Sequence, residues 1–288
     1  MTAAARRCLV CGDPMRSALT TWLFRCRACG LWAADLSSGP AGRIAEDQRA
    51  VALEPLRVAN FNVLLDRLET VMPLRDARVL DVGCAHGWFL SLAVQRGMVT
   101  EGIEPDAAIA EATRRRGLPV RTGSFPDDVE PSACYDIITF NDVLEHLPDP
   151  GGALGACRAH LAPGGKLAVT LPDSHGVLYH IACLWARAGR DAYLERLWQV
   201  GFPSPHLYYF NAMNLSRLAA RHGFRLLHQD TLASMRVRGL WSRLAMDRSA
   251  SGVAKAVTYG GLLLAHPLMR FVLPADILVQ IYQRNARP

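Results

Sequence analysis

The sequence contains very little lysine and no long hydrophobic run. Only two of its 288 residues are lysine, so the formal net charge of +6 comes almost entirely from arginine and argues only weakly for an acidic partner. No apolar run follows Arg6 and Arg7, as it would in a secretory signal peptide. The longest late apolar stretch, residues 256–269, is too short to span a bilayer and contains a proline. These absences predict a soluble, cytoplasmic protein.

The length suits one large α/β domain with a small additional unit. Half of the residues are apolar, which is enough for a full core. Four cysteines are scattered among apolar segments, where a free cysteine is usually a small buried residue; they are Cys84, Cys134, Cys157 and Cys183. The other four cysteines lie close together near the N-terminus and need another explanation.

The N-terminal cysteines form two matched C-x-x-C pairs, Cys8 with Cys11 and Cys26 with Cys29, and a glycine follows each pair. Two such pairs place four thiolates tetrahedrally around zinc. Disulfides are disfavoured in a reducing cytosol, and a redox pair is disfavoured because the two pairs match and no βαβ pattern surrounds them. We therefore predict a structural Zn²⁺ ion in a ribbon of residues 1–34, a unit too small to fold around a core of its own.

Residues 35–49 have the composition of a linker, which separates the ribbon from a larger domain over residues 50–288. Apolar residues recur at helical spacing over residues 50–72. We expect this helix to precede the sheet and to cover part of a ligand pocket.

An apolar run, a glycine loop and a helical pattern follow one another within residues 77–93. This order predicts a strand that ends at Asp81, a tight turn and a helix. Gly83 and Gly87 allow the backbone to turn and to approach a ligand, which the unpaired N–H groups at the start of the helix would face. A small polar ligand is therefore expected here. The predicted contacts from this loop are Asp81, Gly83, Cys84, Ala85 and Gly87.

Two later stretches support a nucleoside ligand. A second predicted strand ends in Glu104, about twenty residues after the glycine loop, where an acid can accept hydrogen bonds from ribose hydroxyls. Residues 135–150 read as a strand that opens into a polar turn at the carboxyl edge of the sheet, where open α/β sheets place their sites.

At these three stretches the chain resembles the class I S-adenosylmethionine-dependent methyltransferases, in particular the group with D-x-G-C-x-x-G and D-V-L-E-H-x-P-D-P signatures. The resemblance covers roughly residues 50–285. It implies a doubly wound, seven-stranded, mainly parallel α/β sheet that binds S-adenosyl-L-methionine at the glycine loop. Residues 224–232 and 277–284 are expected to be the last two strands, and the resemblance implies that the final one is antiparallel. Ala85 departs from the family pattern, which usually has glycine there, and we expect this small change to leave cofactor binding intact.

The same resemblance implies further cofactor contacts. Ser124 and Phe125 follow a third predicted strand and would flank the adenine, with Ser124 near the exocyclic amine and Phe125 against the ring. Many relatives carry an acid near this serine. The set is completed by Pro105 and Asn141.

Three interpretations of the turn after the fourth strand stay open. His146 could act as general base and take a proton from an acceptor hydroxyl. Asp142, Glu145 and His146 could instead form a metal site that resembles the E-x-x-E-H set of some O-methyltransferases. In the third interpretation, Glu145 and His146 only brace the loop through backbone hydrogen bonds.

Two further segments read as insertions into the domain. Residues 173–205 are helical and rich in aromatics, as in a lid, and the next segment resembles an H-L-x-x-F motif that would place His206 and Tyr208 beside the transferred methyl group. His206 is thus a second candidate base. Residues 236–273 are apolar and basic, which suits contact with an anionic membrane, a cap on the substrate site or a helical hairpin packed on its own domain.

Together these features predict methyl transfer from S-adenosylmethionine to oxygen of a small-molecule, glycan-linked or lipid-linked acceptor. One alternative is a zinc-ribbon methyltransferase of ribosomal or transfer RNA, which the arginines of the ribbon suggest. No Asn-Pro-Pro-Tyr-type motif follows the fourth strand, which argues against methylation of a base amino group. A second alternative is a non-catalytic binding protein that retains the fold.

Overall fold

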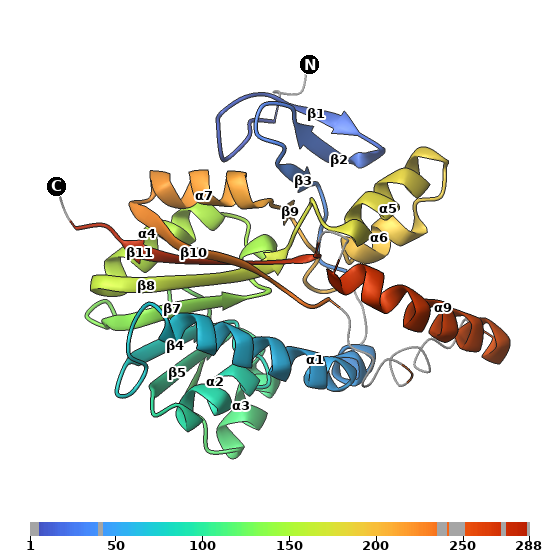
Figure 1. Ribbon diagram of the computed structural model, residues 1–288. Helices are drawn as coiled ribbons and strands as arrows, with labels where there is room; N and C mark the ends of the chain where they lie inside the picture. The colour runs from blue at the N-terminus through green and yellow to red at the C-terminus, as the bar shows by residue number, and fades with distance from the viewer. Residues whose placement is uncertain (1–5, 40–42, 235–240, 242–250, 272–274, 287–288) are drawn as a thin grey trace.

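The structure is a computed structural model that describes residues 6–39, 43–234, 241, 251–271 and 275–286. Within these ranges the chain forms a small sheet near the N-terminus and a large sheet covered by helices on both faces (Figure 1).

The large sheet contains seven strands, which are β4 (Arg78–Val82), β5 (Val99–Glu104), β6 (Val120–Thr122), β7 (Tyr135–Asn141), β8 (Leu161–Pro172), β10 (Phe224–Leu232) and β11 (Ile277–Arg284). Their order across the sheet is β10-β11-β8-β7-β4-β5-β6. Strands β4 to β8 pair in parallel, whereas β11 is antiparallel to both of its neighbours. The predicted doubly wound, mainly parallel sheet is therefore confirmed, including its antiparallel last strand.

Helices cover both faces of this sheet (Figure 1). One face carries α1 (Arg43–Glu69), α2 (Trp88–Gln95) and α3 (Ala107–Arg115), and the other carries α4 (Pro150–His160) and α7 (Ala212–Arg221). Successive residues of a strand point to opposite faces, so β7 contributes to two apolar layers. Ile137 packs with residues of α1 and α2, whereas Phe140 packs with residues of α4 and α7.

Helix α1 begins at Arg43, so helical conformation extends into the segment predicted as a linker. The region predicted as a helical insertion contains α5 (Val177–Arg187) and α6 (Ala192–Leu197), which follow β8 in the chain. A short 3₁₀ helix, Leu144–His146, forms the turn after β7.

The small sheet joins the N-terminal unit to the large domain. Its strands are β1 (Met15–Ala18), β2 (Thr20–Cys26), β3 (Trp32–Ala34) and β9 (Tyr208–Tyr209), in the order β1-β2-β3-β9. All three pairings are antiparallel. Because β9 comes from the large domain, the two parts of the chain share one sheet.

The predicted basic segment, residues 236–273, lies partly outside the described residues. Its described part contains α9 (Gly252–Phe271). In the part of the chain that the structure covers, no helix combines the length and the apolar character needed to cross a bilayer.

Candidate active site

The glycine loop between β4 and α2 has the backbone conformation that its residues predict. Gly83 and Gly87 have φ values of 67° and 68°. A Cβ atom added to Gly83 would lie 2.7 Å from Cγ2 of Val143, so the loop has no room for a side chain there. Ala85 also has a positive φ, 43°, a conformation that costs an L-residue roughly 1 kcal/mol and that glycine adopts more readily.

Glu104 fixes this loop to the end of β5. Its carboxylate accepts hydrogen bonds from the backbone N–H of Ala85 at 2.9 Å and of Asp106 at 3.0 Å. The side chain is 7% exposed and lines the adjoining cavity together with Pro105. The acid that the sequence assigned to the ribose is therefore held rigidly at the carboxyl edge of the sheet.

Asp81 and Asn141 lie beneath the loop in a buried polar network. The Asp81 carboxylate accepts hydrogen bonds from the Thr139 hydroxyl at 2.6 Å and from the Asn141 amide at 2.9 Å. Burial raises the pKa of Asp81 to about 7. Neither residue lines the cavity, and Cys84 and Gly87 do not line it either. These four residues, predicted as cofactor contacts, therefore belong to the loop and its support and not to the cavity wall.

A cavity of about 640 Å³ lies in front of the loop. Of the predicted cofactor contacts, Gly83, Ala85, Glu104, Pro105, Ser124 and Phe125 line it. His146 and His206 also line it. The structure therefore brings together residues from the ends of β4, β5, β6 and β7, which are far apart in the sequence.

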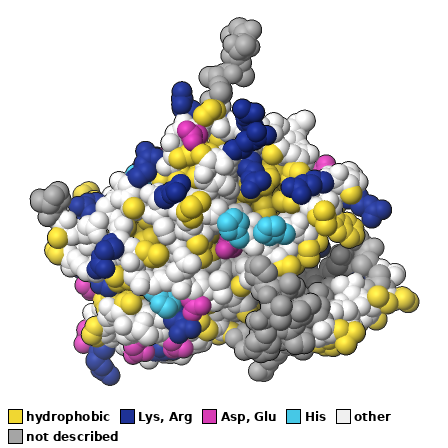
Figure 2. All heavy atoms as spheres, turned by 45° about the horizontal axis from the view of Figure 1, so that its top comes forward, with side chains coloured by type: hydrophobic (Ala, Val, Ile, Leu, Met, Phe, Trp, Pro, Cys, Tyr) yellow, Lys and Arg dark blue, Asp and Glu magenta, His cyan; other side chains and the backbone are white. Residues whose placement is uncertain are grey.

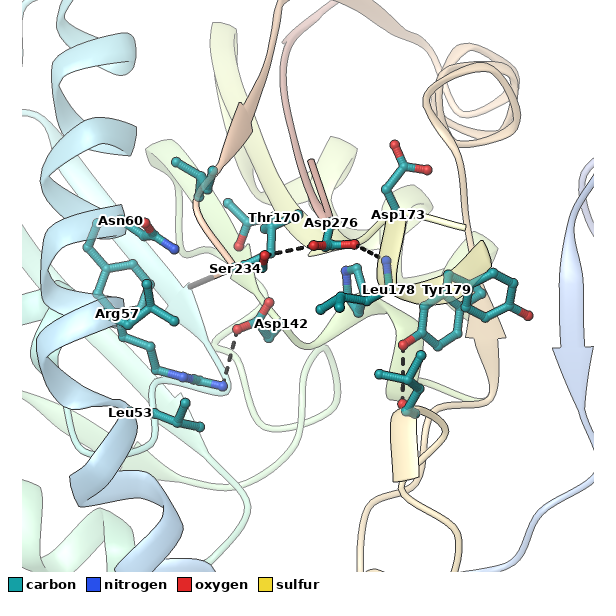
Figure 3. A pocket seen from close by; sticks show the side chains of 17 residues that line it. Leu53, Arg57, Asn60, Asp142, Thr170, Asp173, Leu178, Tyr179, Ser234 and Asp276 are labelled. Atoms are coloured by element: carbon teal, nitrogen blue, oxygen red, sulfur yellow. Dashed lines mark hydrogen bonds and ion pairs between the residues drawn. The ribbon is translucent and has the colours of Figure 1, made fainter. Parts of the chain in front are cut away.

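A second cavity of about 310 Å³ adjoins the first, between α1, α5, the end of β8 and the start of β11 (Figure 3). Its walls are mainly apolar and include Leu178, Tyr179 and Tyr209. The two cavities share five lining residues, which are Leu53, Arg57, Asp142, Pro172 and Ile277.

Arg57 and Asp142 form an ion pair at this shared boundary, with Nη2 of Arg57 3.1 Å from Oδ2 of Asp142 (Figure 3). Asp142 has a φ of 54°, so its backbone is held in the left-handed region directly after β7. Sequence reasoning missed Arg57, although an arginine among the apolar residues of the predicted first helix was a signal.

Asp276 is a second residue that sequence reasoning missed. Its carboxylate accepts hydrogen bonds from the Leu178 N–H and from the Ser234 hydroxyl, both at 2.7 Å (Figure 3). Burial raises the pKa of Asp276. Because β11 is antiparallel, the residue that precedes it lies at the carboxyl edge of the parallel strands, beside the site. The position of Asp276 directly before the last strand was the signal that could have identified it as a site residue.

The two candidate histidines lie side by side, with ring centroids 4.6 Å apart. Nδ1 of His146 is 2.9 Å from the Pro205 carbonyl oxygen, to which it donates a proton in a hydrogen bond, and burial lowers the pKa of His146. Nε2 of His206 is 2.9 Å from the Gln199 amide nitrogen.

Glu145 is buried next to these rings, with Oε1 4.0 Å from Nε2 of His206. Among the described residues neither carboxylate oxygen has a hydrogen-bond partner, and burial, followed by the nearby charge of Asp142, raises the pKa of Glu145. Atoms of Glu145, His146 and His206 lie within 4.8 Å of one another. Asp142, which the sequence grouped with Glu145 and His146, is not part of this cluster and pairs with Arg57 instead.

The four N-terminal cysteines gather in one place. Their sulfur atoms lie within 4.8 Å of one another, and Sγ of Cys8 is 3.4 Å from Sγ of Cys29, as is Sγ of Cys11 from Sγ of Cys26. The glycine after each pair has a positive φ and donates its N–H to the first cysteine of that pair. The two C-x-x-C turns thus have the same backbone form.

A doubly wound sheet with an anionic residue opposite its first glycine loop defines a class of nucleoside-binding α/β proteins. Within that class, a family model described as a methyltransferase domain matches residues 56–229. The chain belongs to this methyltransferase family, and it is an S-adenosylmethionine-dependent methyltransferase.

Curated relatives are named ubiquinone biosynthesis O-methyltransferases. The protein from Xylella fastidiosa (strain 9a5c) is 30% identical over 190 residues, which cover 64% of this chain and 73% of the relative. The protein from Xanthomonas oryzae pv. oryzae (strain PXO99A) is 30% identical over 151 residues, which cover 50% of this chain and 61% of the relative.

Solved structures share the fold at low sequence identity. A methyltransferase from Mesorhizobium loti has a TM-score of 0.52 and 16% identity, covering 76% of this chain and 96% of its own. The [4+2]-cyclase SpnF has a TM-score of 0.55 and 16% identity, covering 87% and 100%. These similarities concern the fold alone.

Proposed function

We propose that the larger cavity binds S-adenosylmethionine, that the smaller cavity binds a hydroxylated small-molecule acceptor, and that the methyl group passes between them to oxygen. The observation that supports this most strongly is the shared boundary of the two cavities at Arg57 and Asp142. A donor in one cavity and an acceptor in the other would meet there without crossing solvent, as an in-line displacement requires.

The residues around the larger cavity suit this cofactor. Gly83 lines this cavity with its backbone, at a position that has no room for a side chain, and the Glu104 carboxylate offers acceptors for ribose hydroxyls. Ser124 and Phe125 lie where the adenine would pack. Arg57 is the only lysine or arginine among the described lining residues, so it is the natural partner of the cofactor carboxylate. When bound, the cofactor supplies an electrophilic methyl group on a sulfonium.

The smaller cavity limits the size of the acceptor. Its volume of about 310 Å³ holds roughly a single ring with its substituents, and its apolar walls carry a few polar groups that can orient a ligand. A glycan or lipid chain attached to the acceptor would have to extend outside it. The names of the curated relatives support oxygen as the methylated atom.

With the cofactor held at Gly83 and Glu104, its methyl carbon would be open to an acceptor oxygen, and sulfur would keep the electron pair of the broken sulfur–carbon bond. The hydroxyl proton needs a base. His146 and His206 line the larger cavity and not the smaller one, so an acceptor hydroxyl that reaches past the shared boundary would meet them. We assign the role of base to His146, with His206 as the second candidate. Because Nδ1 of His146 donates to the Pro205 carbonyl, Nε2 is its basic nitrogen. Burial lowers the pKa of His146, so the ring is neutral at pH 7 and ready to accept a proton.

The cysteine cluster has the donor chemistry of a structural zinc site. Four thiolates are a closed, soft ligand set that leaves no position for substrate. We therefore assign Zn²⁺ to Cys8, Cys11, Cys26 and Cys29, within a ribbon over residues 1–34. We assign no obligatory second ion to Glu145, His146 and His206, so turnover is expected without added magnesium.

The RNA alternative depends on the exposed arginines of the ribbon, and Figure 2 shows basic side chains around the N-terminal unit. The Arg25 guanidinium lies 4.9 Å from the Trp32 ring and that of Arg6 lies 5.2 Å from the Phe24 ring. These contacts engage both arginines within the ribbon. RNA binding would weaken steeply with salt, whereas small-molecule binding would not. Peripheral membrane contact through residues 236–273 remains a separate proposal, which vesicle sedimentation tests.

The proposed function is tested by calorimetry with S-adenosylhomocysteine and by radiolabelled methyl transfer to a panel of phenols, catechols and sugars. We expect binding and transfer to at least one acceptor class. His146→Ala should lower turnover at least tenfold while cofactor affinity stays within a few-fold, because a base acts on the acceptor and not on the nucleoside. Equal loss of both properties would show that this histidine braces the fold.

A further inference from the structure

The N-terminal unit holds the segment that follows the lid. Strand β3 pairs with β9, with Trp32 opposite Tyr209 and Ala33 opposite Tyr208. The Ala34 N–H also donates to the Leu207 carbonyl at 2.9 Å. The backbone of residues 207–209 is therefore paired with strand β3 of the ribbon.

Aromatic side chains continue this contact. The ring centroids of Trp32 and Tyr179 are 5.7 Å apart, and those of Trp22 and Trp198 are 5.9 Å apart, both in edge-to-face packing. The Tyr179 and Tyr209 rings in turn lie 4.5 Å apart. Four of these five residues are less than 10% exposed, and all belong to one apolar cluster that spans the ribbon, α5, α6 and β9.

Two of these residues, Tyr179 and Tyr209, form part of the wall of the smaller cavity. Tyr179, Leu197 and Tyr209 line it, and the Tyr209 hydroxyl donates to the Leu197 carbonyl at 3.2 Å (Figure 3). One layer of aromatic residues thus separates the ribbon from the cavity. None of the described residues that line the larger cavity comes from the ribbon.

The cysteine-bearing turns are also fixed to the large domain at a second place. The Arg221 guanidinium donates to the Val10 carbonyl at 2.6 Å, and the Asn214 amide donates to the Cys29 carbonyl at 3.4 Å. Val10 and Cys29 lie in the two C-x-x-C turns. Both cysteine-bearing turns of the ribbon are therefore hydrogen-bonded to the large domain, which fixes the position of the ribbon on that domain.

We propose that the ribbon is part of the acceptor site. Trp32 directly, and Trp22 through Trp198, whose ring lies 4.8 Å from that of Tyr209, are positioning residues that hold Tyr179 and Tyr209 in the cavity wall. The metal-bound cysteines keep that support in place. The proposal rests on the proposed function, which assigns the smaller cavity to the acceptor. It extends that function by making the N-terminal unit necessary for acceptor binding and unnecessary for cofactor binding.

Hydrogen–deuterium exchange on the full chain tests the proposal without an acceptor. Trp32→Ala should speed exchange of residues 177–187 and 206–210 about tenfold, because the wall opens locally, and leave residues 78–104 within twofold. Removal of the metal from wild type with a chelator should give the same pattern. Affinity for S-adenosylhomocysteine should stay within twofold in both cases.

Trp185→Ala is the matched control, since Trp185 lies on α5 but is 48% exposed and lines neither cavity. If Trp32→Ala fails to fold, Trp32→Leu keeps the apolar bulk and removes the ring contact. Unchanged exchange at the wall would overturn the proposal, as would an equal increase in β4 and β5, which would make the ribbon a general stabilising unit. Because exchange needs no acceptor, a positive result supports the ribbon wall even if the cavity proves not to bind the acceptor.

Discussion

At the scale of single residues, Asp81 shows how the site is built on a buried acid. Its pKa of about 7 lies above the ordinary 3.8 because burial disfavours the charged carboxylate. The folded state therefore holds a proton that the unfolded chain releases between these two pH values. The resulting contribution to stability is present at low pH and is lost as pH rises through about 7.

Asp81→Asn tests this linkage, because an amide oxygen can accept both hydrogen bonds without carrying a charge. The free energy of unfolding of the variant minus that of wild type should increase by roughly 3 kcal/mol between pH 4 and pH 8. Urea denaturation at the two pH values measures it, and other titrating groups cancel in the difference. A difference that does not change with pH would contradict the raised pKa.

Residues with local requirements could be predicted from the sequence. Gly83 is needed for its backbone conformation, and Glu104 lies at a fixed distance along the chain, so both were recognised and both line the larger cavity. Arg57 and Asp276 were missed because their partners lie far away in sequence, Asp142 for the first and Leu178 and Ser234 for the second. Only the packing of α1 and β11 brings them to the site.

At the scale of elements, the start of α5 depends on Asp276. This carboxylate accepts the N–H of Leu178 in the first turn of the helix, as an N-cap side chain does, although it comes from another part of the chain. Gly176, at the N-cap position itself, offers no side chain. The start of α5, beside the smaller cavity, is thus fixed to the edge of the sheet.

Asp276→Ala should lower the free energy of unfolding by about 1–2 kcal/mol through loss of this cap. Asp191→Ala is the matched control, because Asp191 occupies the N-cap position of α6 and makes no side-chain cap bond. Chemical denaturation should show less than about 0.5 kcal/mol for the control. Equal effects of the two substitutions on the free energy of unfolding would show that Asp276 does not cap α5.

Elements with strong periodicity were predicted well, and the pairing of a very short strand was not. The last two strands of the sheet were predicted within the bounds that β10 and β11 have in the structure. Strand β9 has two residues, Tyr208 and Tyr209, too few for any pattern, and its pairing with β3 is set by the docking of the ribbon. The sequence therefore predicted two units and could not show that they share a sheet.

At the scale of the whole molecule, the metal is expected to hold the N-terminal unit together. Elemental analysis should find one zinc ion per chain, and Cys26→Ser should reduce it to well below half and lower the unfolding temperature by roughly 5 °C or more. Cys134→Ser is the control, because this exposed cysteine lies outside the cluster and should change neither quantity. Wild type without zinc, or full zinc retention in Cys26→Ser, would contradict the assignment.

The central claim is that the larger cavity binds the cofactor and the smaller cavity binds the acceptor. Leu178→Trp tests this claim most directly. Leu178 lines only the smaller cavity, so a tryptophan there should fill it and lower kcat/KM for the acceptor at least tenfold, while the Kd of S-adenosylhomocysteine stays within twofold. Leu184→Trp, on the exposed side of the same helix, should change neither value. Normal turnover in Leu178→Trp, or a matching loss of cofactor affinity, would contradict the account.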